Sequence, residues 1–262
     1  MAHKDDRDDF KQHAAAQTAA LGRDEGAFRR SVETVLDLDR HDYTYLWEWG
    51  GAPIIQWPAD IMATQEAIWR CRPDVIIETG VARGGSILFL ASMVELLSIC
   101  DPDGVEKRVI GVDVDIRAHN RETIEAHPLS RKVTLVEGSS TVDETFATVK
   151  ALIPDGARVM AILDSDHAFS HVAAELRLYA PLVTPGCYLV AADTLLGHLA
   201  ADEFPTKRST VLSPGDEPLS AVQDFLKENK DFSADPALNA KLVLSSSPGG
   251  YLRRVAAARE QD

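Results

Sequence analysis

Basic residues are scarce in this sequence. Its 27 Lys and Arg residues are outnumbered by 41 Asp and Glu residues, which gives a formal net charge of -14, and they form no basic run. Because affinity for nucleic acids depends on clustered Lys and Arg, we expect no nucleic-acid partner.

Cysteine pairs and long apolar runs are also absent. Cys71, Cys100 and Cys187 lie far apart and form no Cys-x-x-Cys pair, so their spacing suits neither a disulfide framework nor a zinc site. No segment approaches the apolar length of a membrane span, and the first ten residues lack the apolar core of a signal peptide. We therefore expect a cytoplasmic protein without a membrane partner.

The length and composition favour one decorated α/β domain. A chain of 262 residues with 45% hydrophobic residues can bury a sizeable core. We assign residues 1–58 to an N-terminal extension: a disordered charged end at 1–9, a helical pattern at 10–38 and an aromatic stretch at 43–57. The aromatic stretch has two open interpretations, a wall of a ligand pocket or a packing and oligomer contact. The extra apolar surface predicts a homo-oligomer.

Residues 59–262 alternate between strand and helix patterns. Short apolar runs of this kind predict a mainly parallel, doubly wound sheet covered on both faces. A terminal antiparallel hairpin with a turn at Pro248–Gly250 would complete seven strands, and a loop insertion is expected at about 194–218. The predicted strands are Asp74–Thr79, Arg108–Val114, Lys132–Val136, Arg158–Leu163, Cys187–Ala192, Lys241–Ser245 and Tyr251–Val255. The predicted helices are Ala59–Arg70, Ser86–Ile99, Ala118–Ala126, Val142–Leu152, Ser170–Tyr179 and Leu219–Asn229.

A glycine-rich turn follows the first of these strands. The turn has the sequence pattern Glu-x-Gly-x-x-Arg-Gly-Gly-Ser, and its candidate ligand-binding residues are Glu78, Gly80, Arg83, Gly84 and Ser86. Such a turn directs backbone N–H groups and a helix N-terminus toward a ligand at the carboxyl edge of the sheet. The spacing departs from the Gly-x-Gly-x-x-Gly dinucleotide pattern, which disfavours a nicotinamide-dependent reductase. A glutamate suits a ligand that carries an ammonium and a sulfonium better than a pyrophosphate.

Acidic and small residues end the next two strands. Asp113, followed by Asp115, stands where an acid can accept hydrogen bonds from the two ribose hydroxyls of a nucleoside. Ser139 follows the third strand, where small residues could lie beside an adenine.

In this order, these motifs resemble a known family. Together with Leu163-Asp164-Ser-Asp166-His167, they are similar to the cephalosporin-hydroxylase-type methyltransferases and to the rhamnosyl and macrolide-sugar O-methyltransferases of natural-product and antibiotic pathways. The resemblance covers about residues 40–255. It implies a Rossmann-like methyltransferase fold, S-adenosylmethionine as methyl donor, a small-molecule hydroxyl acceptor and often magnesium. The donor would contact the glycine turn, Asp113, Asp115, Ser139 and Asp164.

The family pattern also suggests catalytic roles. The histidine three residues after the fourth-strand aspartate is the general base, which is His167 after Asp164, and imidazole has a suitable pKa for that role. Carboxylates at neighbouring strand ends, Asp164 and Asp193, would hold Mg²⁺. The family has Glu-Asp where this chain has Ala192-Asp193. Two alternatives therefore stay open: Asp166 or water completes the metal site, or no metal is used.

Two other functions are considered beside O-methylation. The first is N- or C-methylation of a small metabolite, for which the missing carboxylate at position 192 matters less. The second is a non-catalytic S-adenosylmethionine-binding protein, against which the retained Asp164 and His167 argue.

Overall fold

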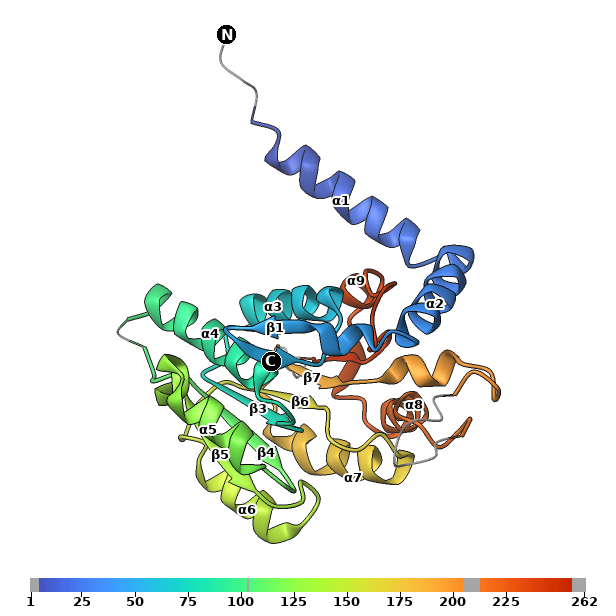
Figure 1. The fold of residues 1–262 in the computed structure, drawn as a ribbon. Coiled ribbons are helices and arrows are strands. Elements are labelled where there is room, and N and C mark those ends of the chain that lie inside the picture. The colour runs from blue at the N-terminus through green and yellow to red at the C-terminus, as the bar shows by residue number, and fades with distance from the viewer. Residues whose placement is uncertain (1–4, 103, 205–212, 256–262) are drawn as a thin grey trace.

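The computed structural model describes residues 5–102, 104–204 and 213–255, whose strands form one large sheet and one small one (Figure 1). The small sheet is an antiparallel hairpin of β1 (Trp47–Trp49) and β2 (Ala52–Ile54). The large sheet contains β3 (Val75–Thr79), β4 (Arg108–Asp113), β5 (Val133–Glu137), β6 (Val159–Leu163), β7 (Tyr188–Ala191), β8 (Phe232–Ala234) and β9 (Tyr251–Arg254).

Helices connect these strands and precede them. The α-helices are α1 (Arg7–Leu21), α2 (Glu25–Asp39), α3 (Pro58–Cys71), α4 (Gly85–Cys100), α5 (Ala118–Ala126), α6 (Asp143–Ala151), α7 (Phe169–Tyr179), α8 (Pro218–Glu228) and α9 (Pro236–Asn239). The 3₁₀ helices are η1 (Tyr43–Leu46), η2 (Pro128–Lys132), η3 (Ala180–Leu182) and η4 (Thr194–His198).

The large sheet has the strand order β5-β4-β3-β6-β7-β9-β8. The first five strands of this order are parallel, and β9 pairs antiparallel with both β7 and β8. In Figure 1, α3 and α4 lie on one side of the sheet, and α6, α7 and α8 lie on the other. The predicted Rossmann-like fold, with seven strands, a C-terminal antiparallel hairpin and an N-terminal helical extension, is confirmed.

Burial explains why the central strands read as nearly continuous apolar runs. Every residue of β3, β6 and β7 is buried, as expected for strands covered on both faces. Helix α4 buries nine of its residues because it lies between the sheet and the β1–β2 hairpin, where Trp49 packs edge-on against Phe89 at a ring distance of 4.9 Å. One core therefore joins the sheet, its helices and the aromatic hairpin.

The strand register brings the functional segments to one edge. Thr79 pairs with Val112 of β4 and with Leu163 of β6, and Leu163 pairs in turn with Ala191 of β7. Because these strands are parallel, the residues that follow them emerge side by side at their carboxyl ends. The glycine turn, the segment after β6 and Asp193 therefore meet.

The terminal hairpin differs from its prediction. The partner of β9 in the hairpin is β8, and Lys241–Ser245 forms no strand, so that prediction was wrong. The reason is a competing interaction, since the Ser245 and Ser246 hydroxyls and the Ser246 N–H donate to the carboxylate of Asp60 in α3. Residues 245–246 therefore lie against α3 and add no strand to the sheet.

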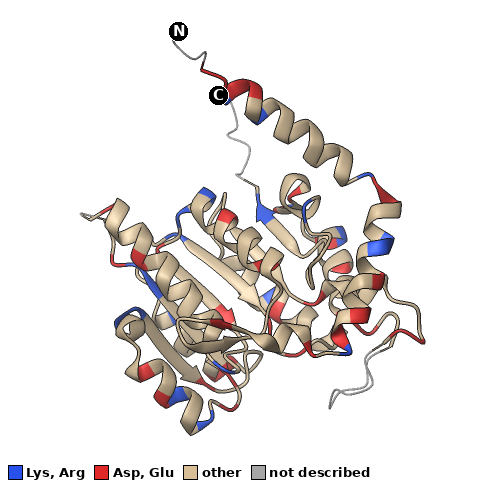
Figure 2. Ribbon diagram, turned by 45° about the horizontal axis from the view of Figure 1, so that its top comes forward, with Lys and Arg blue, Asp and Glu red and all other residues tan. Residues whose placement is uncertain are grey.

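The helical pattern predicted at 10–38 forms two helices. Helix α1 ends at Leu21, and Asp24 caps α2 by accepting a hydrogen bond from the Ala27 N–H at 2.8 Å. Helix α1 buries none of its residues and projects away from the sheet in both views (Figures 1 and 2), with contacts to α9. We expected residues 1–9 to lack structure; α1 begins at Arg7, and residues 1–4 lie outside the described residues. No helix in the described part of the chain is long and apolar enough to cross a membrane.

A buried ion pair holds the opposite edge of the sheet together. The ammonium of Lys107, whose side chain is 3% exposed, lies 3.0 Å from Asp74 Oδ1 and 3.2 Å from Asp101 Oδ2. The other oxygen of Asp74 accepts the N–H of Arg158 at 2.9 Å. Asp74 therefore joins the starts of β3, β4 and β6, and its charge is balanced by Lys107.

We expect Lys107→Met to lower the free energy of unfolding by about 3 kcal/mol, because it leaves Asp74 with an uncompensated buried charge. The matched control is Lys227→Met, which removes an exposed ion pair to Asp224 and should cost less than about 1 kcal/mol. Urea unfolding of both variants measures the difference. Equal losses would contradict a structural role for the buried pair.

Candidate active site

The turn between β3 and α4 is held by close backbone packing. Gly80 has a φ of +93°, and a Cβ atom built there would lie 1.9 Å from the carbonyl oxygen of Asp164. The Asp164 N–H in turn donates to the Thr79 carbonyl at 3.0 Å. Only glycine allows this contact, so the sequence signal at Gly80 reflects the joining of the β3 and β6 ends as well as an approach to a ligand.

Asp113 holds the same turn from the end of β4. Its Oδ2 accepts the N–H groups of Val81 at 2.8 Å and Ala82 at 3.1 Å, and its Oδ1 accepts the N–H of Asp115 at 3.1 Å. Asp113 was predicted as a ribose ligand; the contacts seen here are to the backbone of the glycine turn. The Asp115 side chain is 69% exposed and lies 3.7 Å from Arg117.

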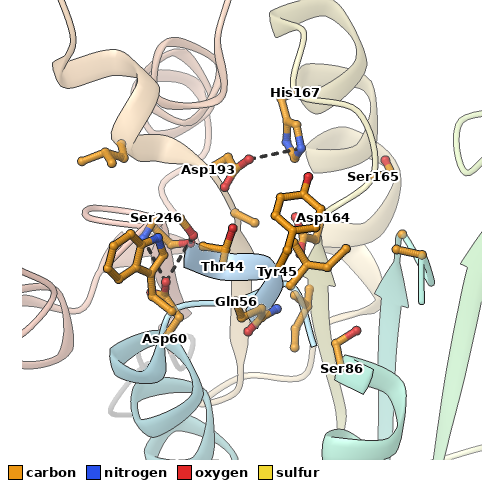
Figure 3. Close-up of a pocket in the computed structure, with 18 of the residues that line it drawn as sticks. Thr44, Tyr45, Gln56, Asp60, Ser86, Asp164, Ser165, His167, Asp193 and Ser246 are labelled. Atoms are coloured by element: carbon orange, nitrogen blue, oxygen red, sulfur yellow. Dashed lines mark hydrogen bonds and ion pairs between the residues drawn. The ribbon is translucent and has the colours of Figure 1, made fainter. Parts of the chain in front are cut away.

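A cavity of about 600 Å³ lies at this edge of the sheet. It brings together most of the residues predicted from sequence, and Figure 3 shows several of them facing one another. The predicted residues that line it are Gly80, Arg83, Gly84, Ser86, Asp164, Asp166, His167 and Asp193. The predicted residues outside its lining are Glu78, Asp113, Asp115 and Ser139.

Glu78 lies directly behind the cavity wall. Its side chain is 1% exposed, and its Oε2 accepts a hydrogen bond from the Ser86 hydroxyl at 3.0 Å. Burial raises the pKa of Glu78 to about 8, while the hydrogen bond from Ser86 opposes this shift. The glutamate is therefore one hydrogen bond away from a residue that lines the cavity, and it is neutral below about pH 8 in the ligand-free protein.

The side chains of His167 and Asp193 form a close pair in the cavity lining. The Nε2 of His167 lies 3.2 Å from Asp193 Oδ2, and the two side chains are only 20% and 17% exposed. Asp193 adopts a left-handed φ of +54° where β7 gives way to η4, a conformation that aspartate tolerates better than most residues. The Asp193 carboxylate is therefore positioned to fix the orientation of the His167 imidazole.

The acidic residues present do not make up a metal centre. Ala192 supplies no ligand, Asp193 is paired with His167, and Asp166 Oδ1 accepts the N–H of Ala168, the residue before α7, at 2.8 Å. Within the described ranges, no three His, Cys, Asp or Glu side chains gather in a way that could hold a metal ion. The predicted magnesium site at Asp164 and Asp193, with Asp166 or water as a further ligand, therefore stays a prediction.

A buried polar network lies behind Ser165, another lining residue. The Nε2 of His171 is 3.1 Å from the hydroxyls of both Ser140 and Ser165, and Ser165 also donates to Glu175 Oε1 at 2.8 Å. Glu175 is fully buried, and its hydrogen bond raises the pKa of His171. Helix α7 thereby ties together the segments that follow β5 and β6. These residues were not predicted, because pairs four apart on a helix are common on solvated faces too.

Asp60 is the cavity residue that sequence reasoning missed most clearly. It lies in α3, is 3% exposed, and accepts hydrogen bonds from the 245–246 segment. Burial raises the pKa of Asp60 to about 6, opposed by these hydrogen bonds, and the nearby charge of Asp193 adds to the rise. The only sequence signal was a single acid in the first turn of a helix, where acids are common.

The aromatic stretch forms part of the cavity wall. Tyr43 packs against Trp57 at a ring distance of 4.8 Å and against Trp47 at 5.6 Å, which holds η1 beside the cavity. Tyr45, in the same short helix, lines the cavity although it is 60% exposed, and its ring lies close to Asp164 in Figure 3. Both open interpretations thus have support within one chain: Trp57 and Trp49 pack inside, and Tyr45 faces the cavity.

The fold and this edge together define a class of protein. A parallel sheet that ends in an antiparallel hairpin, with a glycine turn, Asp164 and His167 at its carboxyl edge, is the arrangement of the Rossmann-like methyltransferases. Residues 41–255 match the Rhamnosyl O-methyltransferase/CmcI family, and the chain belongs to that family.

Relatives with assigned names and solved structures agree with this family assignment. The chain is 30% identical to the rhamnosyl O-methyltransferase of Mycobacterium tuberculosis (strain ATCC 25618 / H37Rv) over 204 residues, covering 75% of this chain and 73% of the relative. It is 28% identical to that of Mycobacterium leprae (strain TN) over 240 residues, covering 87% and 94%. An apo structure of CmcI and a CmcI structure described as Mg-SAM each match with a TM-score of 0.53 and 24% identity, covering 81% of this chain and 78% of theirs. These two structures support the fold.

We expect Gly80→Ala to be strongly destabilising, because the new Cβ would collide with the Asp164 carbonyl. Gly186→Ala is the matched control: Gly186 also has a positive φ, of +86°, but nothing lies within 4 Å of its Cβ position. The control should lose about 1 kcal/mol for backbone strain alone. Thermal or urea unfolding should show a clearly larger loss for Gly80→Ala, and equal losses would mean that the strand ends can separate without penalty.

Proposed function

We propose that this chain is an S-adenosylmethionine-dependent O-methyltransferase that methylates a hydroxyl of a sugar or similar small molecule. Family membership supports the reaction class, and one observation carries the site: the glycine turn and the His167–Asp193 pair line the same cavity. A methyl donor at the turn and an acceptor at the imidazole would therefore meet.

The donor end of the cavity is proposed to be the turn from Gly80 to Ser86. Asp113 fixes the N–H groups of this turn, and the N-terminus of α4 begins directly after it. Ser86, backed by Glu78, would meet the ammonium of the donor, and Arg83 its carboxylate. We also propose that Asp115 contacts the ribose of the donor and that Ser139 contacts its adenine.

The acceptor end is proposed to be His167. S-adenosylmethionine supplies a methyl group on a positively charged sulfur. His167 would take the hydroxyl proton as the acceptor oxygen bonds to the methyl carbon and the sulfur–methyl bond breaks, leaving a neutral thioether. Asp193 would hold the resulting imidazolium, and Asp164, at the adjacent strand end, would help to orient the two reactants. The donor set gives no reason to route a step through a metal.

The base favours oxygen as the methylated atom. A hydroxyl needs proton removal for efficient attack, whereas the lone pair of an unprotonated amine is already available. The oriented His167–Asp193 pair therefore favours O-methylation over N-methylation and over a non-catalytic binding role. A role in natural-product or antibiotic biosynthesis belongs to the same proposal. We also propose a homo-oligomer, because α1 buries none of its residues and Phe10 is 71% exposed.

The direct test is transfer of labelled methyl from S-adenosylmethionine to metabolites in extracts of the source organism, with and without EDTA. We expect a labelled methyl ether in both reactions. A labelled N- or C-methyl product would replace the O-methyl proposal, and no product beside a tightly bound donor would favour the non-catalytic alternative. Loss of product on chelation would show that a metal is required after all.

We expect His167→Ala to lower kcat by about 10²–10⁴-fold, the usual contribution of a positioned general base, with little change in donor affinity. His119→Ala is the control, because His119 lies outside the cavity lining, and it should retain activity. Steady-state kinetics and calorimetry on both variants separate chemistry from donor binding. Unchanged kcat in His167→Ala would place the base elsewhere.

Donor binding should release a proton near neutral pH. Glu78 is protonated below about pH 8 in the free protein, and an ammonium bound nearby favours the carboxylate, so its pKa should fall on binding. Calorimetry at pH 7 in buffers of different ionisation enthalpy should show about one proton released for the wild type. The matched variant Glu78→Gln should release far less. Equal proton release from both proteins would remove Glu78 from the donor site.

A further inference from the structure

The cavity that we assign to donor and acceptor has a strongly one-sided charge. Among the described residues that line it, Arg83 is the only arginine or lysine and His167 the only histidine. Its carboxylates come from Asp39, Asp42, Asp60, Asp164, Asp166 and Asp193. A donor with one sulfonium, one ammonium and one carboxylate balances only a small part of this charge.

Two of these carboxylates lie apart from the donor end. Asp39 ends α2, and Asp42 is the residue before η1, so neither comes from a strand end where the donor is proposed to bind. Both are exposed, yet both line the cavity. Their position is fixed by packing, because α2 and η4 share an apolar cluster that includes Val35, Trp57 and Leu196. Asp39 and Asp42, the acidic wall of the cavity, are therefore held beside η4, which directly follows Asp193 of the proposed acceptor end.

Apolar surface lies beside this acidic wall. Tyr45 presents its ring to the cavity, and Leu36, Leu195 and Leu199 line it as well. An aromatic ring next to polar groups suits the apolar face of a sugar ring. The acceptor end thus combines a surface for stacking with a negative potential and offers no lysine or arginine of its own among the described residues.

We propose that the acceptor is a sugar that carries a basic amine, with its ammonium facing Asp39 and Asp42. This inference rests on the proposed function and specifies its substrate class. In a partly solvated cavity, two carboxylates at separations of several ångströms attract an ammonium and repel another carboxylate. An amine should therefore improve affinity about tenfold over the neutral sugar, and a carboxylate should weaken it about as much.

The test compares three sugars that share one ring and differ in charge: methyl glucoside, methyl glucosaminide and methyl glucuronide. Their affinities are measured by calorimetry or NMR titration on the full chain saturated with S-adenosylhomocysteine, at moderate salt. Saturation with this donor product is checked first, so that a failed donor site is recognised separately from a failed acceptor preference. We expect the amine to bind about tenfold more tightly than the neutral sugar, and the uronide to bind most weakly.

The double variant Asp39→Asn, Asp42→Asn should bring the amine-to-neutral ratio to within about threefold. The matched control is Asp37→Asn, on the same helix but outside the cavity lining, with a side chain that is 70% exposed and paired with Arg40. It should leave the ratio unchanged, because Asp37 does not line the cavity and its charge is paired with Arg40. A uronide that binds as well as the neutral sugar, or an amine preference that survives the double variant, would overturn the proposal.

Discussion

The contact between Gly80 and the Asp164 carbonyl is the constraint on which the site depends. It forces the ends of β3 and β6 together with no room for a side chain, and Asp113 fixes the N–H groups of the same turn from β4. The start of α4, the segment carrying His167 and the end of β7 are then placed around one cavity. The glycine turn thus packs the two strand ends together, and this packing positions the turn to bind a ligand.

Negative charge is compensated differently at the two edges of the sheet. At the sheet's opposite edge, Asp74 is balanced by a buried lysine, whereas Glu78 and Asp60 accept hydrogen bonds from hydroxyls and a backbone N–H. Burial raises the pKa values of Glu78 and Asp60 accordingly. Carboxylates held in this way favour cationic ligands. A sulfonium donor fits that environment, and the same physics motivates the amine-bearing acceptor.

Much of this could be predicted from the sequence because it depends on local patterns. Buried parallel strands produce apolar runs, and the glycine turn and the acids after the strands follow from topology. The failures came from long-range contacts. The segment 241–245 has strand-like composition, but serines from this part of the chain bind Asp60, almost two hundred residues away. Asp60 itself, the contact of His171 with Ser140 and the pairing of Asp193 with His167 arise only when separate segments meet. The Ser165–His171–Glu175 contacts are local, but their spacing is also that of an ordinary solvated helix face. Part of the predicted insertion, residues 205–212, lies outside the described residues.

The central claim is that this cavity binds the methyl donor with groups supplied by the chain itself. The most direct measurement is calorimetric titration of the protein with S-adenosylhomocysteine in the presence of EDTA, with NADH titrated in parallel. We predict one site per chain in the micromolar range for the former and no heat for the latter. Binding of NADH, or the absence of any S-adenosylhomocysteine binding with and without Mg²⁺, would contradict this account.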